Sequence, residues 1–222
     1  MGLLNDPRLE ALLDGLHAQS AGQDDAIGAY FRRRAAEGTL DWNRFDGETD
    51  RFFADKLVAL EKEKAQFCYA LCRALRAARV VEAGTSFGVS MLYLAAAVRD
   101  NGGGTVIGTE YEPAKAAAAR RNFDAAGLAD YIDLREGDLA ETLAVIEGPV
   151  DFLLLDIWTA MVVPAVTRVL PHLRPGAVIV ADNVIAARQG YAAYYELLAD
   201  PNNGLRTMTL PFPGGLEMSV KV

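Results

Sequence analysis

The chain has 222 residues, of which 51% are hydrophobic, and it carries a formal net charge of -8 at pH 7. This length and apolar content suit one globular domain that buries most of its apolar surface on folding. The negative charge repels phosphate backbones and anionic lipids, so neither nucleic acid nor a membrane is expected as a partner. No apolar run reaches the roughly 18 residues of a membrane span, and the segment MGLLNDPRLE lacks the pattern of a signal peptide. We therefore expect a soluble cytoplasmic protein.

The first part of the chain, residues 1–53, is rich in alanine and charged residues and predicts helices. We expect it to form a lid, a substrate-binding region or a dimer contact beside a core made by residues 54–222. From Phe53 to Ala78, apolar residues recur at three- and four-residue spacing, which predicts one long amphipathic helix. The only two cysteines, Cys68 and Cys72, share a face of that helix and are expected to be small core residues.

Short apolar runs then alternate with helical stretches. The strand candidates are residues 78–84, 104–110, 131–138, 150–156 and 176–182. Helices are predicted between them, near residues 90–99, 113–126, 139–146 and 162–173. Runs that are apolar on both faces are typical of parallel strands covered by helices on both sides. With two further strands predicted around the turn PFPGG near the C-terminus, the pattern predicts a doubly wound, mostly parallel α/β sheet of seven strands with an antiparallel edge pair.

Polar residues gather where the predicted strands end. Glu82 ends the first strand and is followed by Gly84 and Gly88, while Glu110 ends the second strand and Asp138 the third. Ligands of doubly wound sheets bind beyond these carboxyl ends, and glycines allow close approach of the backbone. The loop lacks the G-x-G-x-x-G spacing of dinucleotide sites, which disfavours a nicotinamide cofactor and a dehydrogenase. A carboxylate after the second strand suits the hydroxyls of a ribose, so we expect an adenosyl ligand.

Several motifs carry a family resemblance. VEAGTSFGVS, GTEYEP and REGD look like the successive motifs of the class I S-adenosylmethionine-dependent methyltransferases. LLDIWT followed by VADNVI, together with EKEKAQ at Glu61–Gln66, is similar to segments of catechol O-methyltransferase and its cation-dependent relatives that methylate small molecules. The resemblance runs from about Leu57 to the C-terminus. It implies a Rossmann-like methyltransferase fold, S-adenosylmethionine as cofactor and a small-molecule acceptor, and enzymes of this type are commonly homodimers.

The resemblance also implies roles for individual residues. Glu110 would bind the ribose, the Gly84–Ser90 loop would hold the methionine part, and Trp158 would pack beside the adenine. The cofactor-binding residues predicted in this way are Glu82, Gly84, Thr85, Ser86, Gly88, Ser90, Glu110, Tyr111, Asp138, Leu139, Asp156 and Trp158. The resemblance further implies a divalent cation, with Mg²⁺ expected, on Asp156, Asp182 and Asn183.

The cation also has physical support that is independent of the family. Asp156 and Asp182 end the fourth and fifth predicted strands, and two close carboxylates repel each other unless a proton or a cation lies between them. The amide oxygen of Asn183 adds a third oxygen donor, a set that suits Mg²⁺ with water or substrate oxygens in its remaining positions. The simpler alternative is that Asp182 and Asn183 only cap the next turn.

Thr159 departs from the family pattern. Catechol O-methyltransferase and its relatives have D-x-x-K, in which the lysine is the general base, whereas this chain has D-x-x-T from Asp156 to Thr159. A threonine hydroxyl is too weak a base, and loss of a positioned base costs roughly 10²- to 10⁴-fold in rate. Asp156 and Thr159 are therefore the candidate catalytic positions, and the acceptor is left open.

Three hypotheses about function follow from these residues. The first is S-adenosylmethionine-dependent methyl transfer to a small molecule, at oxygen and with a divalent cation. The second is transfer to nitrogen or to an acidic oxygen without a metal, and the third is a non-catalytic adenosyl-binding protein. Lys64 is a candidate gate or electrostatic partner of the site. The acceptor pocket is expected to be bordered by Arg188, Tyr191, Tyr194 and Tyr195.

Overall fold

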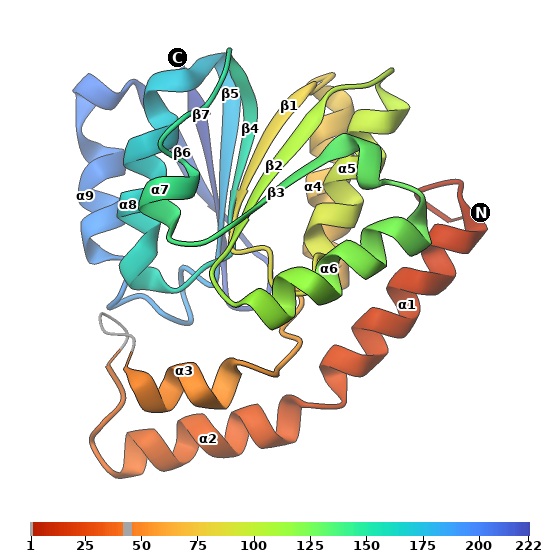
Figure 1. Ribbon diagram of the computed structural model, residues 1–222. Coiled ribbons are helices and arrows are strands. Elements are labelled where there is room, and N and C mark those ends of the chain that lie inside the picture. Colours follow the sequence, from red (N-terminus) through yellow and green to blue (C-terminus); the bar gives the residue numbers. More distant parts are fainter. Residues whose placement is uncertain (1, 42–45) are drawn as a thin grey trace.

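A seven-stranded sheet forms the centre of the molecule, and helices cover both of its faces (Figure 1). The computed structural model describes residues 2–41 and 46–222. The strand order is β3-β2-β1-β4-β5-β7-β6. The strands are β1 (Arg79–Ala83), β2 (Thr105–Glu110), β3 (Ile132–Glu136), β4 (Val150–Leu155), β5 (Leu173–Asp182), β6 (Leu205–Leu210) and β7 (Leu216–Lys221). The first five strands are parallel, and β7 runs antiparallel between β5 and β6, which confirms the predicted fold.

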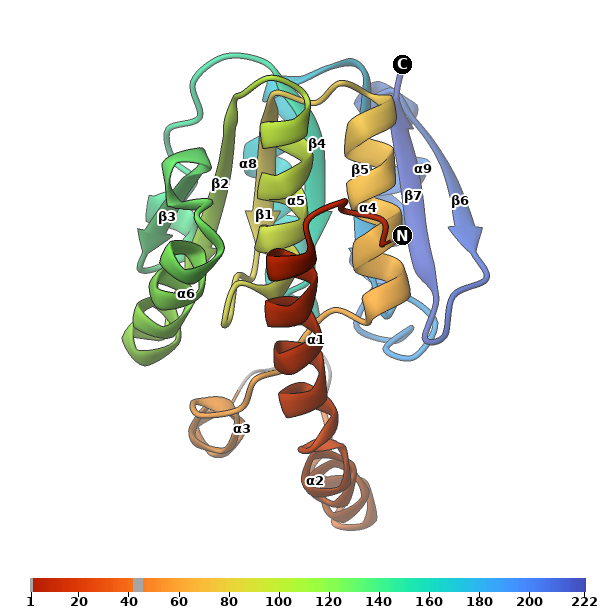
Figure 2. The ribbon, with the colours of Figure 1, turned by 90° about the vertical axis from the view of Figure 1, so that its right-hand side faces the viewer.

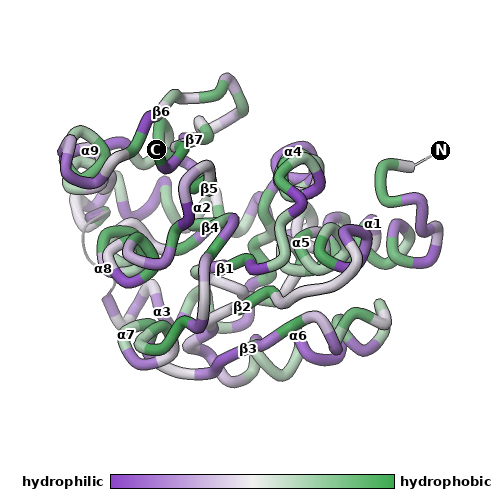
Figure 3. Tube along the Cα trace, turned by 90° about the horizontal axis from the view of Figure 1, so that it is seen from above, coloured by the Kyte–Doolittle hydropathy of each residue, from purple (hydrophilic) through white to green (hydrophobic). Residues whose placement is uncertain are grey.

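The central strands are buried on both faces, as their continuous apolar sequences predict. In β1, Val80 packs on one side of the sheet and Val81 on the other, because successive side chains of a strand point to opposite faces. The first face carries α4 (Lys62–Ala74), α5 (Val89–Asp100) and α6 (Pro113–Ala126), and the second carries α7 (Leu139–Thr142), α8 (Thr159–Val169) and α9 (Ala192–Ala199) (Figure 3). No helix in the described part of the chain is long and apolar enough to cross a membrane.

The N-terminal helices lie in two different places. The first, α1 (Pro7–Ala21), packs on α5, where Arg99 pairs with Asp6 at 2.9 Å and the ring of His17 contacts the hydroxyl of Tyr93 at 3.2 Å. The next two, α2 (Asp24–Ala36) and α3 (Gly47–Phe53), form a pair that lies beyond the carboxyl ends of the strands (Figure 2). We call this pair the α2–α3 hairpin. Its position brings it close to the predicted ligand edge of the sheet.

The long helix predicted from Phe53 to Ala78 is wrong over its first part. Residues 54–61 form no helix, and α4 begins only at Lys62. The backbone groups of this segment are bound by side chains from far along the chain: Gln23 bonds both N–H and C=O of Leu57, and the Ser20 hydroxyl accepts from the N–H of Ala59 at 3.1 Å. These bonds replace the helical ladder, so tertiary contacts override the helical spacing of the sequence.

Gly84 allows the loop after β1 to lie directly against the end of β4. Its φ is +95°, and a Cβ added there would be 2.1 Å from the carbonyl oxygen of Asp156. A backbone contact at this distance cannot be relieved by a side-chain rotation. The loop and the strand end must therefore separate if position 84 carries a side chain.

We expect Gly84→Ala to lower the free energy of unfolding by roughly 1–3 kcal/mol more than Gly102→Ala. Gly102 is a matched control, because its φ of +105° imposes similar backbone strain while an added Cβ would meet nothing within 4 Å. Urea denaturation of both variants measures the difference. Equal losses would show that backbone strain alone, and not the contact with Asp156, makes glycine necessary at position 84.

Candidate functional site

A cavity of about 740 Å³ lies at the carboxyl ends of the parallel strands, a volume that suits small ligands. Its walls come from the loops after β1 to β5, from the segment between α3 and α4 and from the α2–α3 hairpin. The predicted site residues that line it are Gly84, Thr85, Ser86, Ser90, Glu110, Tyr111, Asp138, Leu139, Asp156, Trp158, Thr159, Asp182 and Asn183. Glu82 and Gly88, also predicted to bind the cofactor, do not line it.

The carboxylate of Glu110 is fixed in this cavity by two backbone amides. The N–H of Ser86 donates to one oxygen at 2.6 Å, and the N–H of Glu112 donates to the other at 2.8 Å. Ser86 has a φ of +50°, so the loop after β1 adopts a left-handed turn where it meets the carboxylate. This arrangement orients Glu110 at the end of β2, in the place predicted for ribose binding.

The same loop contains buried hydroxyls that have no partner. Among the described residues, the side-chain oxygens of Thr85 and Ser86 are buried without a hydrogen bond, and both residues line the cavity. A buried hydroxyl without a partner costs free energy, and most such groups in proteins are satisfied. These two are therefore available to polar groups of a bound ligand.

Glu82 and Gly88 do not line the cavity but support the loop after β1. Both carboxyl oxygens of Glu82 are buried without a hydrogen bond in the described structure. Burial raises the pKa of Glu82 to about 7, and the hydroxyls of Ser90 and Thr85 oppose this rise without reaching hydrogen-bonding geometry. At Gly88, where φ is +82°, an added Cβ would meet the ring of Phe123 at 2.3 Å, so this glycine permits close packing of the start of α5 on α6.

Asp138, Trp158 and Tyr111 are three further predicted cofactor-binding residues that line the cavity. Asp138 caps α7, because its carboxylate accepts from the N–H of Ala140 at 2.7 Å. Tyr111 is 69% exposed and lies at the rim rather than inside. Trp158 contacts Phe53 of α3 edge to face, with 5.2 Å between the ring centroids. The tryptophan thus connects the sheet edge to the α2–α3 hairpin.

Asp156 and Asp182 lie side by side at one end of the cavity, because β4 and β5 pair in a register that sets Leu155 opposite Ala181. Burial raises the pKa of Asp182 to about 6, and the Lys64 ammonium opposes the rise. Burial, with a further contribution from the charge of Asp182, raises the pKa of Asp156 well above its usual range. The two carboxyls therefore disfavour each other's ionisation.

One buried ammonium compensates part of this charge. Lys64, which is fully buried on α4, donates to Asp182 at 2.5 Å and pairs with Glu61 at 2.8 Å. The second oxygen of Asp182 accepts from the side-chain amide of Asn183 at 2.8 Å. The carboxyl of Asp156 accepts no hydrogen bond from any residue of the described segments.

The donor chemistry fits a divalent cation. Two carboxyls and one amide are the hard oxygen donors that Mg²⁺ prefers, and a cation between them would relieve their repulsion. The described residues hold no group of three or more His, Cys, Asp or Glu that could bind a metal, so the protein would supply two carboxyls and the remaining ligands would be the amide, water or substrate. Asn183 now presents its amide nitrogen to Asp182, so its side chain would have to turn to offer oxygen.

Thr159 is buried at the start of α8, where the family lysine is replaced. An added Cβ at Gly190 would meet its hydroxyl oxygen at 2.5 Å, so Thr159 packs closely against the backbone of the loop before α9. Of the residues expected to border the acceptor pocket, Tyr191 lines the cavity and donates to the carbonyl of Asp182 at 2.6 Å. Arg188, Tyr194 and Tyr195 do not line it, because α9 turns Tyr194 into the core beneath the sheet.

The sequence interpretation missed the wall formed by the α2–α3 hairpin. Phe31 and Phe53 line the cavity together with smaller residues of both helices. The available signal was the gathering of six aromatic residues, at positions 30, 31, 42, 45, 52 and 53, in a segment otherwise dominated by charged and small residues. Lys115 of α6 also lines the cavity, and burial lowers its pKa despite four nearby carboxylates.

The raised pKa of Glu82 predicts a specific dependence of stability on pH. The pKa of its carboxyl is 4.5 when unperturbed and about 7 in the folded protein. As the pH rises above 4.5, the carboxyl ionises in the unfolded chain before it does so in the folded protein, so the stability of the fold decreases. Relative to Glu82→Gln, the cofactor-free protein should lose roughly 2 kcal/mol of stability between about pH 5 and pH 8, with most of the loss below pH 7. Urea denaturation across this range measures it, with the exposed Glu141→Gln as control. Parallel curves for wild type and Glu82→Gln would contradict the prediction.

Comparisons with known proteins identify the family of this chain. A methyltransferase domain family matches residues 81–184. Catechol O-methyltransferase of Mycobacterium tuberculosis is 31% identical over 182 residues, which cover 82% of this chain and 73% of the relative. Catechol O-methyltransferase of Niastella koreensis is 32% identical over 58% of this chain and 59% of the relative. The crystal structure of cofactor-bound Rv0187 from M. tuberculosis matches with a TM-score of 0.69 at 25% identity, over 87% of this chain and 95% of that one. The chain therefore belongs to the class I S-adenosylmethionine-dependent O-methyltransferases.

Proposed function

We propose that this methyltransferase transfers the methyl group to an oxygen of a small-molecule acceptor, assisted by a divalent cation held by Asp156, Asp182 and Asn183. The observation that carries the proposal is the pair of adjacent carboxyls at one end of the cavity, Asp182 buried and Asp156 partly exposed, of which Asp156 accepts no hydrogen bond from the described residues. The opposite end offers the fixed carboxylate of Glu110 and two unpaired hydroxyls. The two ends suit different ligands, the cation with the acceptor and the cofactor.

At the cofactor end, the chain supplies fixed hydrogen-bonding groups. Glu110 is held by two amides and needs no rearrangement to accept two bonds from the hydroxyls of a ribose. The unpaired hydroxyls of Thr85 and Ser86 lie in the loop predicted to hold the methionine part. Groups that are oriented before the ligand arrives lose little entropy on binding, so they favour tight and well-aligned binding.

At the acceptor end, the residues would position the acceptor and exclude water. When bound, S-adenosylmethionine supplies an electrophilic methyl group, and a divalent cation lowers the pKa of a coordinated acceptor hydroxyl. Asp156 and Asp182 would hold the cation, and Lys64 would keep Asp182 in place. Methyl transfer requires the acceptor oxygen in line with the methyl group, so most of the protein's contribution is alignment. Because Thr159 offers no side-chain base, activation of the acceptor would depend on the cation or on an acceptor that is already acidic.

A metal-independent transfer is the second candidate, and one observation favours it. Both oxygens of Asp182 are already engaged, by Lys64 at 2.5 Å and by Asn183 at 2.8 Å. In that case the Lys64 ammonium is the cation of the acceptor end, and the acceptor is a nitrogen or an acidic oxygen. The two candidates differ in how activity responds to removal of metal.

For the cofactor site, we expect Glu110→Gln to weaken binding of S-adenosylhomocysteine by at least about tenfold, because hydrogen bonds to a charged group contribute roughly 1.5–3 kcal/mol. Isothermal titration calorimetry measures the dissociation constant. Glu141→Gln, an exposed acid on α7, is the control and should bind as the wild type does. Unchanged affinity in Glu110→Gln would exclude its role at the ribose.

For the cation, exhaustive chelation should lower methylation of catechol at least about tenfold, and added Mg²⁺ should restore it, because the acceptor hydroxyl then loses the group that lowers its pKa. Asp156→Asn should give the same loss without restoration, while Asp130→Asn on the surface should behave as wild type. Activity that survives both chelation and Asp156→Asn would favour the metal-independent candidate. Binding of S-adenosylhomocysteine with no turnover of any acceptor would instead favour a non-catalytic protein.

A further inference from the structure

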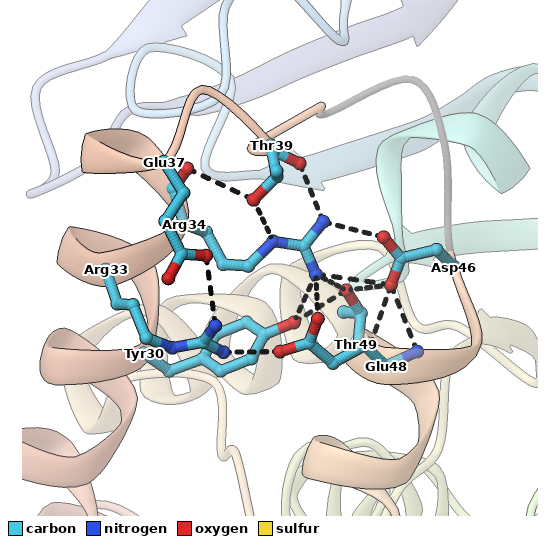
Figure 4. Close-up of polar contacts among 8 residues, drawn as sticks. All are labelled: Tyr30, Arg33, Arg34, Glu37, Thr39, Asp46, Glu48 and Thr49. Atoms are coloured by element: carbon cyan, nitrogen blue, oxygen red, sulfur yellow. Dashed lines mark hydrogen bonds and ion pairs between the residues drawn. The ribbon is translucent and has the colours of Figure 1, made fainter.

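Arg34 is a buried cation inside the α2–α3 hairpin. Its side chain is 7% exposed, and its guanidinium contacts several parts of the hairpin at once (Figure 4). It donates to the hydroxyl of Thr39 at 2.8 Å and to the carbonyl of the same residue at 2.6 Å. It also donates to the hydroxyl of Tyr30 at 3.0 Å and to the carboxylate of Asp46 at 2.6 Å. One planar group therefore joins the end of α2 to the start of α3.

Asp46 completes this connection. It is the N-cap of α3, and its carboxylate accepts from the N–H of Thr49 at 2.9 Å and from the N–H of Glu48 at 3.2 Å. The hydroxyl of Thr49 donates to the same carboxylate at 2.9 Å and contacts the hydroxyl of Tyr30 at 2.8 Å. The start of α3 is thus bound to Arg34 both through its cap and through Tyr30.

The opposite side of the hairpin faces the cavity. Tyr30 stacks on Phe52, with 4.1 Å between ring centroids, and contacts Phe53 edge to face at 5.7 Å. Phe53 in turn contacts Trp158 of the core, and both Phe31 and Phe53 line the cavity. Arg34 itself does not line it. The contacts of Arg34 therefore join the same two helices that carry this aromatic wall.

We propose that Arg34 is a positioning residue for the methyl acceptor: by joining α2 to α3, it holds Phe31 and Phe53 against Trp158 as one wall of the cavity. This inference rests on the proposed function, which identifies the end of the cavity that holds the acceptor. Arginine is required because its planar fork reaches Asp46, Thr39 and Tyr30 together, whereas a lysine ammonium can satisfy only part of the set. Loss of the charge leaves Asp46 without its partner and frees the two helices to separate.

The adjacent Arg33 provides a control. Its side chain is 46% exposed and forms surface ion pairs with Glu37 and Glu48, and its guanidinium lies 5.4 Å from the centroid of the Tyr30 ring. Exposed pairs of this kind contribute little to stability. Arg33→Gln therefore removes the same charge and one exposed link between α2 and α3, while the hydrogen bonds of Arg34 stay in place.

The test compares Arg34→Gln, Arg34→Lys and Arg33→Gln in the full chain. Trp42→Phe in every variant leaves Trp158 as the one tryptophan, since the sequence has two. Arg34→Gln should raise quenching of Trp158 by acrylamide at least about twofold, because the hairpin no longer covers it. It should also raise the KM for catechol about fivefold or more, with kcat changed less than about twofold. The affinity for S-adenosylhomocysteine should stay within about threefold, Arg34→Lys should be intermediate, and Arg33→Gln should match the parent.

Two results would overturn the proposal. One is unchanged quenching of Trp158 in Arg34→Gln, and the other is a loss of S-adenosylhomocysteine affinity as large as the rise in KM, which would indicate general destabilisation. If Arg34→Gln does not fold, Asp46→Asn, which keeps an oxygen for the cap but loses the ion pair, takes its place. Because Asp46 itself lines the cavity, that variant is judged by the quenching of Trp158 alone. If the parent does not methylate catechol, catechol is not its acceptor, and the quenching of Trp158 still decides the role of Arg34.

Discussion

The parallel pairing of β1 with β2 and with β4, and of β4 with β5, is the constraint on which the site depends. It brings the carboxyl ends of four strands to one edge of the sheet, and each of these strands ends in or beside an acid. Glu110 and Asp156 approach the cavity from strands on either side of β1, although they are 46 positions apart in the chain. Without this register neither end of the cavity would have its polar groups.

Gathering acids at one edge has an electrostatic cost, and the structure offsets only part of it. Backbone amides stabilise Glu110, and Lys64 stabilises Asp182, whereas the buried Glu82 and the partly exposed Asp156 have raised pKa values and accept no hydrogen bond from the described residues. Unpaired groups of this kind concentrate at functional sites, and of these two only Asp156 lines the cavity, where a ligand can supply the missing partner. A cationic sulfonium near the first pair of strands and a cation near Asp156 would both reduce this charge. Ligand binding should therefore stabilise the fold as well as fill the cavity.

The N-terminal helices add to the core of the fold, and two of them form a wall of the cavity. Helix α1 packs on α5 and extends the core, while the α2–α3 hairpin stands at the mouth of the cavity and adds an aromatic wall. The core supplies the groups expected to bind the cofactor, and the hairpin supplies apolar surface for another ligand. Under the proposed function, the core would supply the cofactor site and the groups that hold the cation, and the hairpin would add an apolar wall beside them.

The sequence by itself determined the alternation of strands and helices, the antiparallel pair at the edge and the polar residues at the strand ends that line the cavity. It could do so because buried strands are apolar on both faces, and the polar residues that follow them, such as Glu110 and Asp156, must lie at one edge. Only the tertiary structure decided the contacts between distant positions. Residues 54–61 are not helical because Gln23 and Ser20 form hydrogen bonds with backbone groups of this segment. The burial of Lys64 is compensated by its ion pair with Asp182, 118 positions away. Such contacts leave no periodic pattern in the sequence, since each depends on how separate elements pack.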